Sequence, residues 1–377
     1  SWCIGHLISM ADAGSYDERY KKWRYEDLPI LPQAWKYAPT PGKEKQLAVL
    51  KELLHRSDVS EVVNGCDAGR EGELIFRFVY EQAGCTKPFS RLWISSMEDS
   101  AIREGFAGRR AGTEYDALYQ SALCRARADW LVGINATRLF SVLYHKTLNV
   151  GRVLSPTLNL LVERDGKITM FHKEKYHIVH IGCGGVDAES ERISDAAAAD
   201  ALRTACEASQ AVCVSLKKEK KTALPPKLFD LTCLQREANR VYGFTAKQTL
   251  DYAQSLYEKR FLTYPRTDSN YLTEDMAQTA TDLVAALLPV LPFMQGAELT
   301  PEIGRVINSA KVSDHHAIIP TAAFAGNGFD RLPESEKKLM SLVCCKLLCA
   351  SAEPYVYEAV TVTFDCGGHS FTAKGKR

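Results

Sequence analysis

The sequence predicts a multidomain fold that combines an α/β domain with helical and β-rich parts. Short apolar strands alternate with amphipathic helices over roughly the first 110 residues, which is typical of a parallel α/β unit. Apolar residues then recur with helical spacing over 116–144. Over 354–368, apolar and polar residues alternate, which indicates an antiparallel strand. With 377 residues, the chain is long enough for two or more domains.

The α/β elements follow from apolar spacing and from the residues that end helices. Gly84 should end the second helix, because glycine readily adopts the left-handed conformation found at helix ends. Ser95 and Glu98 have capping-box spacing, so we expect a third helix to begin there. The predicted elements are helices over 43–56 and 71–84 and strands over 59–67 and 91–94.

The second half of the chain changes between β and helical patterns. Residues 229–290 are mostly helical in pattern, with Thr245 and Gln248 in capping-box spacing. Pro225–Pro226 indicates a hinge between the two parts. The run 217–227 holds five lysines and is either a solvated linker or a local contact for nucleic acid. The predicted strands of the β part cover 175–184, 210–220 and 354–368.

Composition excludes several classes of protein. A formal net charge of +1 gives no overall positive field, so any nucleic-acid binding must depend on local charges. The 12 cysteines form no CxxC pair, which excludes zinc-finger spacing and favours reduced thiols in the cytoplasm. The sequence contains no run of about 18 apolar residues, so no membrane span is predicted. The chain starts without a methionine and ends directly after a predicted strand, so we expect a fragment.

A cluster of carboxylates follows the first predicted strand, in the stretch NGCDAGREGE. Asp67, Glu71 and Glu73 lie within one or two helical turns, beside a strand end where parallel sheets bind ligands. Carboxylates suit Mg²⁺, and Arg70 could pair with one of them or hold a phosphate. The alternative is an exposed helix N-terminus, where the helix dipole favours acidic residues.

The segment FLTYPRTDSN places Tyr264, Arg266 and Asp268 at alternate positions. A tyrosine hydroxyl has a pKa of about 10 and needs help to act as a nucleophile. Arg266 could favour the phenolate and neutralise a phosphodiester, and Asp268 could orient that arginine. The alternative is a packed tyrosine beside a surface Arg–Asp pair.

Two adjacent histidines precede an apolar run in KVSDHHAIIPT. Histidine can donate to a phosphate or transfer a proton. Adjacent residues of a strand point in opposite directions, so at most one of His315 and His316 should reach a given site. The alternative is a histidine that only makes hydrogen bonds in the core.

The order of these motifs resembles the type IA DNA topoisomerases. DAGREGE is followed by GRVLSPTLNLLVERD, LTYPRTDS and DHHAIIPT. SWCIGHL, YKKWRYEDLPI and DWLVGINATR are similar to the topoisomerase III branch, so the resemblance covers essentially the whole chain. It implies an enzyme that cleaves one DNA strand through a 5′-phosphotyrosine link, passes a strand and religates, relaxing negative supercoils or decatenating DNA without ATP. The absence of a GxxxxGK[ST] loop agrees with this.

The resemblance also implies roles for the residues of the cleavage site. Tyr264 corresponds to the nucleophile, Arg266 to its phosphate and phenolate partner, and Asp268 to a supporting, DNA-binding residue. His315 corresponds to the active-site histidine in preference to His316.

The acidic and basic residues receive roles in the same way. Asp67 corresponds to a ligand of Mg²⁺, and Glu71 to a second acidic residue with a metal-binding or catalytic role. Arg70, Arg152 and Ser155 correspond to DNA-binding positions, the last two in the segment that lies near the single strand.

The family fold divides the chain into four expected domains. A Toprim-like α/β domain would cover 1–115, and a helical single-strand-binding domain would cover 116–165. A β-rich arch would use 166–224 and 323–377, and a mobile helical domain, 225–322, would carry the tyrosine. Together these domains would form a torus around DNA.

Three features depart from the family pattern. Gly69 stands where a second aspartate and Mg²⁺ ligand is expected, and Leu154 replaces the usual glutamine. A Glu–Lys pair from a first Toprim strand is absent before Ser1, so we expect part of the active site to be missing.

Two other functions stay open alongside the topoisomerase. The first is a catalytically impaired fragment that binds single-stranded DNA, and the second is a relaxase-like tyrosine nickase. A relaxase normally has two histidines separated by one apolar residue, which HHA does not supply. The expected partners are single-stranded and negatively supercoiled DNA, with a helicase as a further candidate and no membrane. We expect a monomer.

Overall fold

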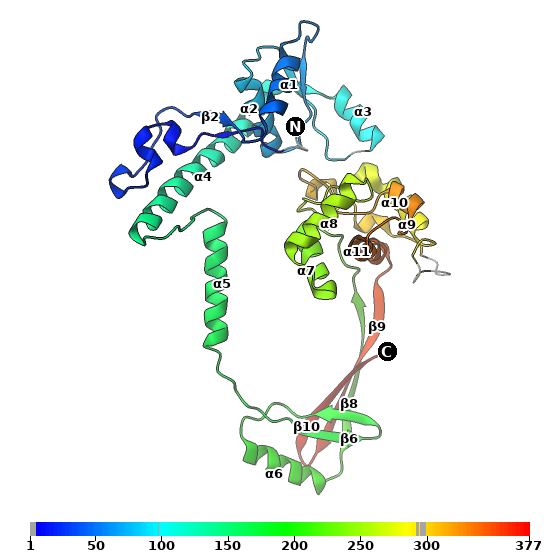
Figure 1. Cartoon of the computed structure of the whole chain (residues 1–377). Coiled ribbons are helices and arrows are strands. Elements are labelled where there is room, and N and C mark those ends of the chain that lie inside the picture. The colour runs from blue at the N-terminus through cyan, green and yellow to red at the C-terminus, as the bar shows by residue number, and fades with distance from the viewer. Residues whose placement is uncertain (1–4, 97, 292–293, 295–298) are drawn as a thin grey trace. The chain divides into compact units, whose positions relative to one another are not determined.

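The structure is a computed structural model that describes residues 5–96, 98–291, 294 and 299–377 (Figure 1). The chain divides into two compact units, which we call the large unit and the small unit. One division follows Pro226, at the junction where the sequence predicts a hinge. The large unit comprises Ser1–Val162 and Lys227–Ser351, and the small unit comprises Glu163–Pro226 and Ala352–Arg377.

The α/β region of the large unit, up to residue 115, contains the predicted parallel strand pair. β3 (Val62–Asn64) runs parallel to β4 (Phe89–Arg91), with Val63 opposite Ser90. β5 (Arg110–Ala111) adds to β4 in the antiparallel direction. The helices of this region are α1 (Glu44–His55), α2 (Arg70–Gln82) and α3 (Asp99–Ala107).

Two local predictions in this region are wrong. The second strand ends at Arg91, where we expected it to begin. The third helix begins at Asp99, with Glu98 as an N-cap residue that makes no side-chain capping bond. The backbone N–H of Glu98 donates to Ser96 Oγ instead, while Ser95 Oγ donates to the distant Ser313 carbonyl. Ser95 therefore makes a tertiary contact instead of the helix cap that its local spacing predicted.

The long helix α4 (Asp116–Leu143) matches the predicted stretch 116–144 and packs against α2. Its buried Tyr119 and Leu123 join Leu74 and Phe78 in one apolar core. The sequence did not predict a small sheet of β1 (Ile8–Met10) and β2 (Tyr37–Pro39). Ile8 of this sheet and the preceding Leu7 join the same core.

The helical region of the large unit, 227–351, has a second apolar core of its own. Helices predominate over 229–290, as predicted, and Thr245 and Gln248 form the predicted capping box. The structure groups 323–351 with this region rather than with the small unit. The helices are α7 (Leu231–Tyr242), α8 (Ala246–Glu258), α9 (Ala277–Leu287), α10 (Ala322–Asn327) and α11 (Glu334–Ser351).

The small unit is built on an antiparallel sheet with strand order β6-β7-β10-β9-β8. Phe364 and Phe371 form its core with Ala188, and α5 (Leu154–Thr169), which crosses from the large unit, has no buried residue. The other elements are β6 (His180–Cys183), β7 (Val186–Glu189), α6 (Ala196–Glu207), β8 (Val212–Ala223), β9 (Tyr355–Cys366) and β10 (His369–Lys376).

The lysine-rich run is mostly a strand and not a linker. Lysines 217, 218, 220 and 221 lie in β8, which pairs with β9 along its length. Lys217 forms an ion pair with Glu219 at 2.6 Å. Among the described residues, no helix has the length and apolar character needed to cross a membrane.

A buried ion network ties β3, α2 and β4 together. The Glu73 carboxylate is fully buried and lies 2.9 Å from Arg77 Nε and 3.2 Å from Arg91 Nε. Asn64 Nδ2 donates to the same carboxylate at 2.8 Å. Burial lowers the pKa of Arg91, and the nearby Glu73 opposes that shift. The network is a constraint on the strand ends because each charge depends on its partner for compensation.

We predict that Glu73→Gln destabilises the large unit by about 3–5 kcal/mol, because it leaves Arg91 buried without a carboxylate. All five tryptophans precede residue 131, so tryptophan fluorescence during urea unfolding reports on the large unit. Glu52→Gln, on the exposed face of α1, should change stability by less than about 0.5 kcal/mol. Equal effects of the two substitutions would contradict the assigned role of Glu73.

Candidate active site

The loop after β3, residues 65–69, carries Asp67 and is held by a buried arginine. Arg91 donates from Nη1 to the Cys66 carbonyl at 2.6 Å and from Nη2 to the Asp67 carbonyl at 2.5 Å. We call this stretch the acidic loop. Because Arg91 is itself held by Glu73, the buried network fixes the backbone that presents the Asp67 side chain.

The turn into α2 requires glycine at position 72. A β-carbon at Gly72 would overlap the Asp67 carbonyl oxygen and lie 2.8 Å from the Asp67 nitrogen. Both obstacles are backbone atoms, which cannot rotate away as a side chain can. The close approach places Asp67 against the N-terminal turn of α2, where the helix dipole favours a negative charge.

Tyr264 lies in the segment 261–270, which we call the tyrosine segment and which follows α8. Backbone and side-chain bonds of Thr263 to Ile319 and Ala317 fix it beside the segment 311–321, which we call the histidine segment. The Tyr264 ring centroid lies 4.3 Å from that of His315 and 5.3 Å from that of Tyr257.

His315 lies between the tyrosine and the acidic loop. Its Nε2 is 3.6 Å from Asp67 Oδ2, its side chain is 19% exposed, and Thr267 Oγ1 donates to its carbonyl at 2.9 Å. Nδ1 of His316 instead contacts the Ala317 carbonyl at 2.8 Å, and burial lowers the pKa of that ring. The structure therefore joins Tyr264, His315 and Asp67 in one continuous set of contacts.

An open cavity of about 380 Å³ adjoins His315. Arg266 is exposed on its wall, and Asp268 accepts a hydrogen bond from Ser313 Oγ at 2.9 Å. Asp314 is half-buried beside them. Burial raises the pKa of its carboxyl, and the charges of Asp268 and Asp67 raise it further. The cavity offers a cation and several acceptors beside the tyrosine segment. Its lining residues are Asp230, Leu231, Thr232, Arg266, Thr267, Asp268, Ser313, Asp314 and His315.

Glu71 is directed to different partners from Asp67. Its carboxylate accepts from Arg125 Nη1 at 2.5 Å and lies 3.7 Å from His6 Nε2. Arg125 also approaches Asp129 at 3.9 Å, and Asp129 accepts from Arg152 Nε at 2.7 Å. A row of alternating charges thus runs from the start of α2 along α4 to Arg152.

The two remaining predicted residues lie at helix starts. Arg70 is the exposed first residue of α2, and its positive charge opposes the upward shift in the pKa of Asp314. Ser155 lies in the first turn of α5, where its Oγ accepts from the Gly151 N–H at 3.2 Å.

The comparisons with known proteins identify the family. A family model described as DNA topoisomerase matches residues 113–377. This chain is 40% identical to the proteins named DNA topoisomerase 3 of Bacillus licheniformis and Bacillus subtilis, over alignments that cover the whole chain. The chain belongs to the type IA DNA topoisomerase family. It spans about half the length of these relatives, 53% of each.

A solved structure supports the same membership of the topoisomerase family. Full-length topoisomerase I from Thermotoga maritima matches with a TM-score of 0.71 and 25% sequence identity. The match covers 99% of this chain and 60% of that one.

The sequence did not indicate three residues that organise the candidate site: Arg91, Arg125 and Asp314. Arg125 and Asp129 are four apart on α4, a spacing that could have indicated an ion pair. Arg91 and Asp314 gave no local signal, because their partners are distant in the sequence.

The chemistry of the site suits Mg²⁺. The charges of Asp268 and Asp67 help to raise the pKa of Asp314, which indicates an excess of negative charge that a hard cation would offset. Within the described part of the chain, no three His, Cys, Asp or Glu side chains gather into a ready set of metal ligands. One or two carboxylates are sufficient for Mg²⁺ where waters and phosphate complete its coordination.

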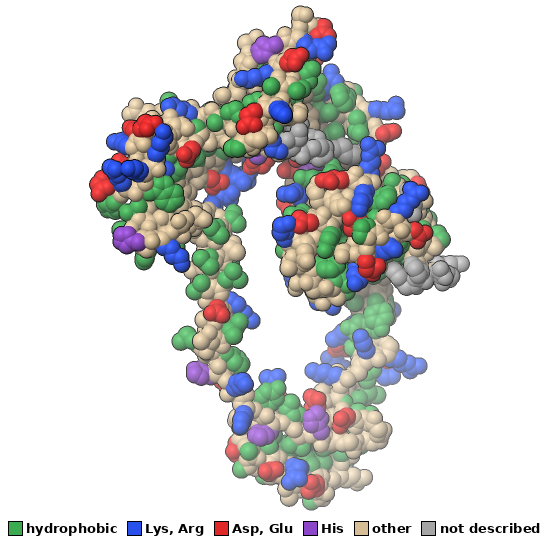
Figure 2. Space-filling view, viewed as in Figure 1, with side chains coloured by type: hydrophobic (Ala, Val, Ile, Leu, Met, Phe, Trp, Pro, Cys, Tyr) green, Lys and Arg blue, Asp and Glu red, His purple; other side chains and the backbone are tan. Residues whose placement is uncertain are grey.

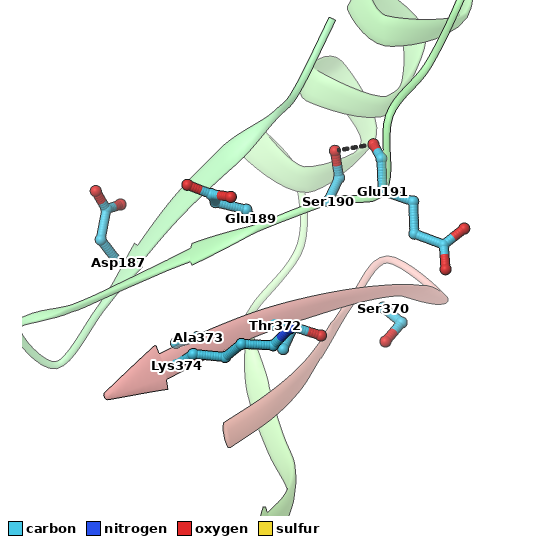
Figure 3. A pocket seen from close by; sticks show the side chains of 8 residues that line it. All are labelled: Asp187, Glu189, Ser190, Glu191, Ser370, Thr372, Ala373 and Lys374. Atoms are coloured by element: carbon cyan, nitrogen blue, oxygen red, sulfur yellow. Dashed lines mark hydrogen bonds between the residues drawn. The ribbon is translucent and has the colours of Figure 1, made fainter. Parts of the chain in front are cut away.

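A second cavity lies in the small unit (Figure 3). Three carboxylates, of Asp187, Glu189 and Glu191, line it with Lys374. The cavity beside Arg266 likewise combines three carboxylates with one Lys or Arg side chain, so charge alone does not favour either cavity for a phosphate. Figure 2 shows Lys and Arg interspersed with Asp and Glu on the face in view, in keeping with the small net charge.

We predict that Gly72→Ala destabilises the large unit by more than about 2 kcal/mol, because the added methyl group meets backbone atoms. Gly133→Ala in α4 is the control, since its β-carbon would meet nothing closer than 3.8 Å. That change should be neutral or stabilising by about 0.5–1 kcal/mol. Urea unfolding measures both, and a neutral Gly72→Ala would contradict the close approach.

Proposed function

We propose that this chain carries the DNA-cleaving part of a type IA topoisomerase. Tyr264 attacks a backbone phosphorus of single-stranded DNA, the bond from that phosphorus to the 3′ oxygen breaks to leave a 3′ hydroxyl, and the 5′ phosphate stays on the tyrosine as a phosphotyrosine ester. A strand passes through the gap and the break is resealed, which relaxes negative supercoils or decatenates DNA without ATP. The observation that carries the proposal is the continuous contact of Tyr264, His315 and Asp67. The relatives named DNA topoisomerase 3 support it.

The side chains beside Tyr264 supply the chemistry that a phenol needs. Attack requires loss of the phenolic proton, and we assign a part in that proton transfer to His315, whose ring lies against that of Tyr264. Arg266 offers a guanidinium that matches a phosphate in charge and shape. The ester conserves the energy of the broken bond, so resealing needs no nucleotide.

Mg²⁺ would be held by Asp67 and Glu71. Bound there, it would neutralise charge on the DNA backbone near the cleavage site. Glu71 is paired with Arg125 in this structure and would have to exchange that partner. The half-buried Asp314 adds a third carboxylate close to Asp67.

DNA binding is assigned to the exposed cations around the site. Arg152 and Arg70 would contact phosphates, and Ser155 and Asp268 would support the strand. Such contacts are largely independent of base sequence and strongly dependent on salt. A helicase partner, a monomeric state and a cytoplasmic location stay predictions.

The four expected domains are also part of this proposal. We assign a Toprim-like domain to 1–115 and the single-strand-binding domain to 116–165. We expected 323–377 to join 166–224 in the arch, but because 323–351 packs with the helical region, we assign 166–224 and 352–377 to the arch and 225–351 to the tyrosine-carrying domain. The parallel pair β3–β4 with Asp67 at its carboxyl end supports the first assignment. The torus stays a prediction.

Tyr264→Phe should abolish the covalent DNA adduct and leave binding of single-stranded DNA intact, because only the hydroxyl is removed. The gene product containing this sequence is incubated with Mg²⁺ and an oligonucleotide labelled at its 3′ end, and the adduct is separated on a denaturing gel. Tyr257→Phe, which alters the neighbouring ring, is the matched control and should form adduct normally. An adduct of normal yield in Tyr264→Phe would overturn the proposal.

Arg152→Ala should weaken binding of single-stranded DNA and lower the slope of log K against log salt concentration by about 0.7, the value for one phosphate contact. Fluorescence anisotropy of a labelled oligonucleotide at several salt concentrations measures this slope. Arg203→Ala, an exposed and ion-paired arginine of α6, is the control and should leave the slope unchanged. Equal slopes for the wild type, Arg152→Ala and Arg203→Ala would show that Arg152 does not contact a DNA phosphate.

A further inference from the structure

Three consecutive residues of the histidine segment contact the α/β region at separate points. Ser95 Oγ donates to the Ser313 carbonyl at 3.5 Å, and His315 lies 3.6 Å from Asp67. Between them, the Asp314 carboxylate occupies the space beside Gly69. A β-carbon on Gly69 would lie 2.5 Å from Asp314 Oδ1 and closer still to Oδ2.

The same three residues also hold the tyrosine segment. Ser313 Oγ donates to Asp268 at 2.9 Å, Thr267 Oγ1 donates to the His315 carbonyl, and the His315 ring contacts Tyr264. Residues 313–315 are therefore the link through which the tyrosine segment is positioned against the acidic loop.

Gly69 leaves room for the Asp314 carboxylate, and glycine is not needed there for backbone conformation. Its φ of −164° and ψ of 177° are extended, a conformation that any residue adopts. Gly69 is also the N-cap residue of α2, so the Asp314 carboxylate lies near the positive end of that helix. The charge of Arg70 adds to this attraction.

We propose that Asp314 is a positioning residue for DNA cleavage and that the side-chain-free surface at Gly69 is the place it occupies. The contact sets how deeply the histidine segment approaches the acidic loop, and so how His315 and Tyr264 lie relative to Asp67. This inference rests on the proposed function, since positioning matters only if Tyr264 cleaves DNA. A shift of about 1 Å in such a site is sufficient to lower a rate by about 100-fold.

The test is a double-mutant cycle of Gly69→Ala and Asp314→Ala in the full gene product, read by the rate of adduct formation. Gly69→Ala alone should slow adduct formation by at least about tenfold, because its methyl group displaces the Asp314 carboxylate. When Asp314→Ala is already present, Gly69→Ala should slow adduct formation by less than about twofold, because the carboxylate that the methyl group would displace is gone. Gly65→Ala, in the same loop with 3.8 Å of clearance, is the control and should be neutral.

A second measurement does not depend on activity. Hydrogen exchange of peptides that cover 311–318 should increase in Gly69→Ala, return toward the wild-type rate in the double variant and stay unchanged in Gly65→Ala. If the wild type forms no adduct, the proposed function fails, while hydrogen exchange still decides the contact. Additive rate losses in the cycle, or equal hydrogen exchange in Gly69→Ala and Gly65→Ala, would overturn the role of Asp314.

Discussion

The contact of residues 313–315 with the acidic loop is the constraint on which the candidate site depends. The tyrosine segment belongs to the helical region, whereas Asp67 belongs to the α/β region, and each region has its own apolar core. Polar contacts join the two regions at the site: His315 with Asp67, Ser95 with Ser313, and Glu98 with Thr279. Polar contacts of this kind can separate without exposing either core, which suits the strand passage that we propose for this chain.

The acidic loop is held by buried groups of its own region. Arg91 and Glu73 are both buried, and their pairing fixes the loop backbone from below. The close approach at Gly72 fixes its exit into α2. The acidic loop is thus preorganised, and the histidine segment meets it through the contacts of residues 313–315. Accurate placement of Tyr264 therefore depends on how well the histidine segment fits the rigid side.

The sequence predicted what local periodicity controls. The helix over 116–144, the parallel α/β region and the capping box at Thr245 are confirmed, because their signals lie within one element. The cap at Ser95 was wrong because that serine bonds to a residue far along the chain. The lysine-rich run 217–221 could not be distinguished from a linker in the sequence, because its partner strand β9 lies near the C-terminal end. Asp314 escaped notice for the same reason, since only the folded chain places it at Gly69.

The most direct test of the central claim is to identify the residue that carries DNA in the covalent adduct. After nuclease and trypsin digestion, tandem mass spectrometry should find the residual nucleotide on the peptide FLTYPR, residues 261–266, and fragment ions should place it on Tyr264. Attachment to another residue, such as the neighbouring Tyr257, would contradict the assignment of the tyrosine and with it the account of the site.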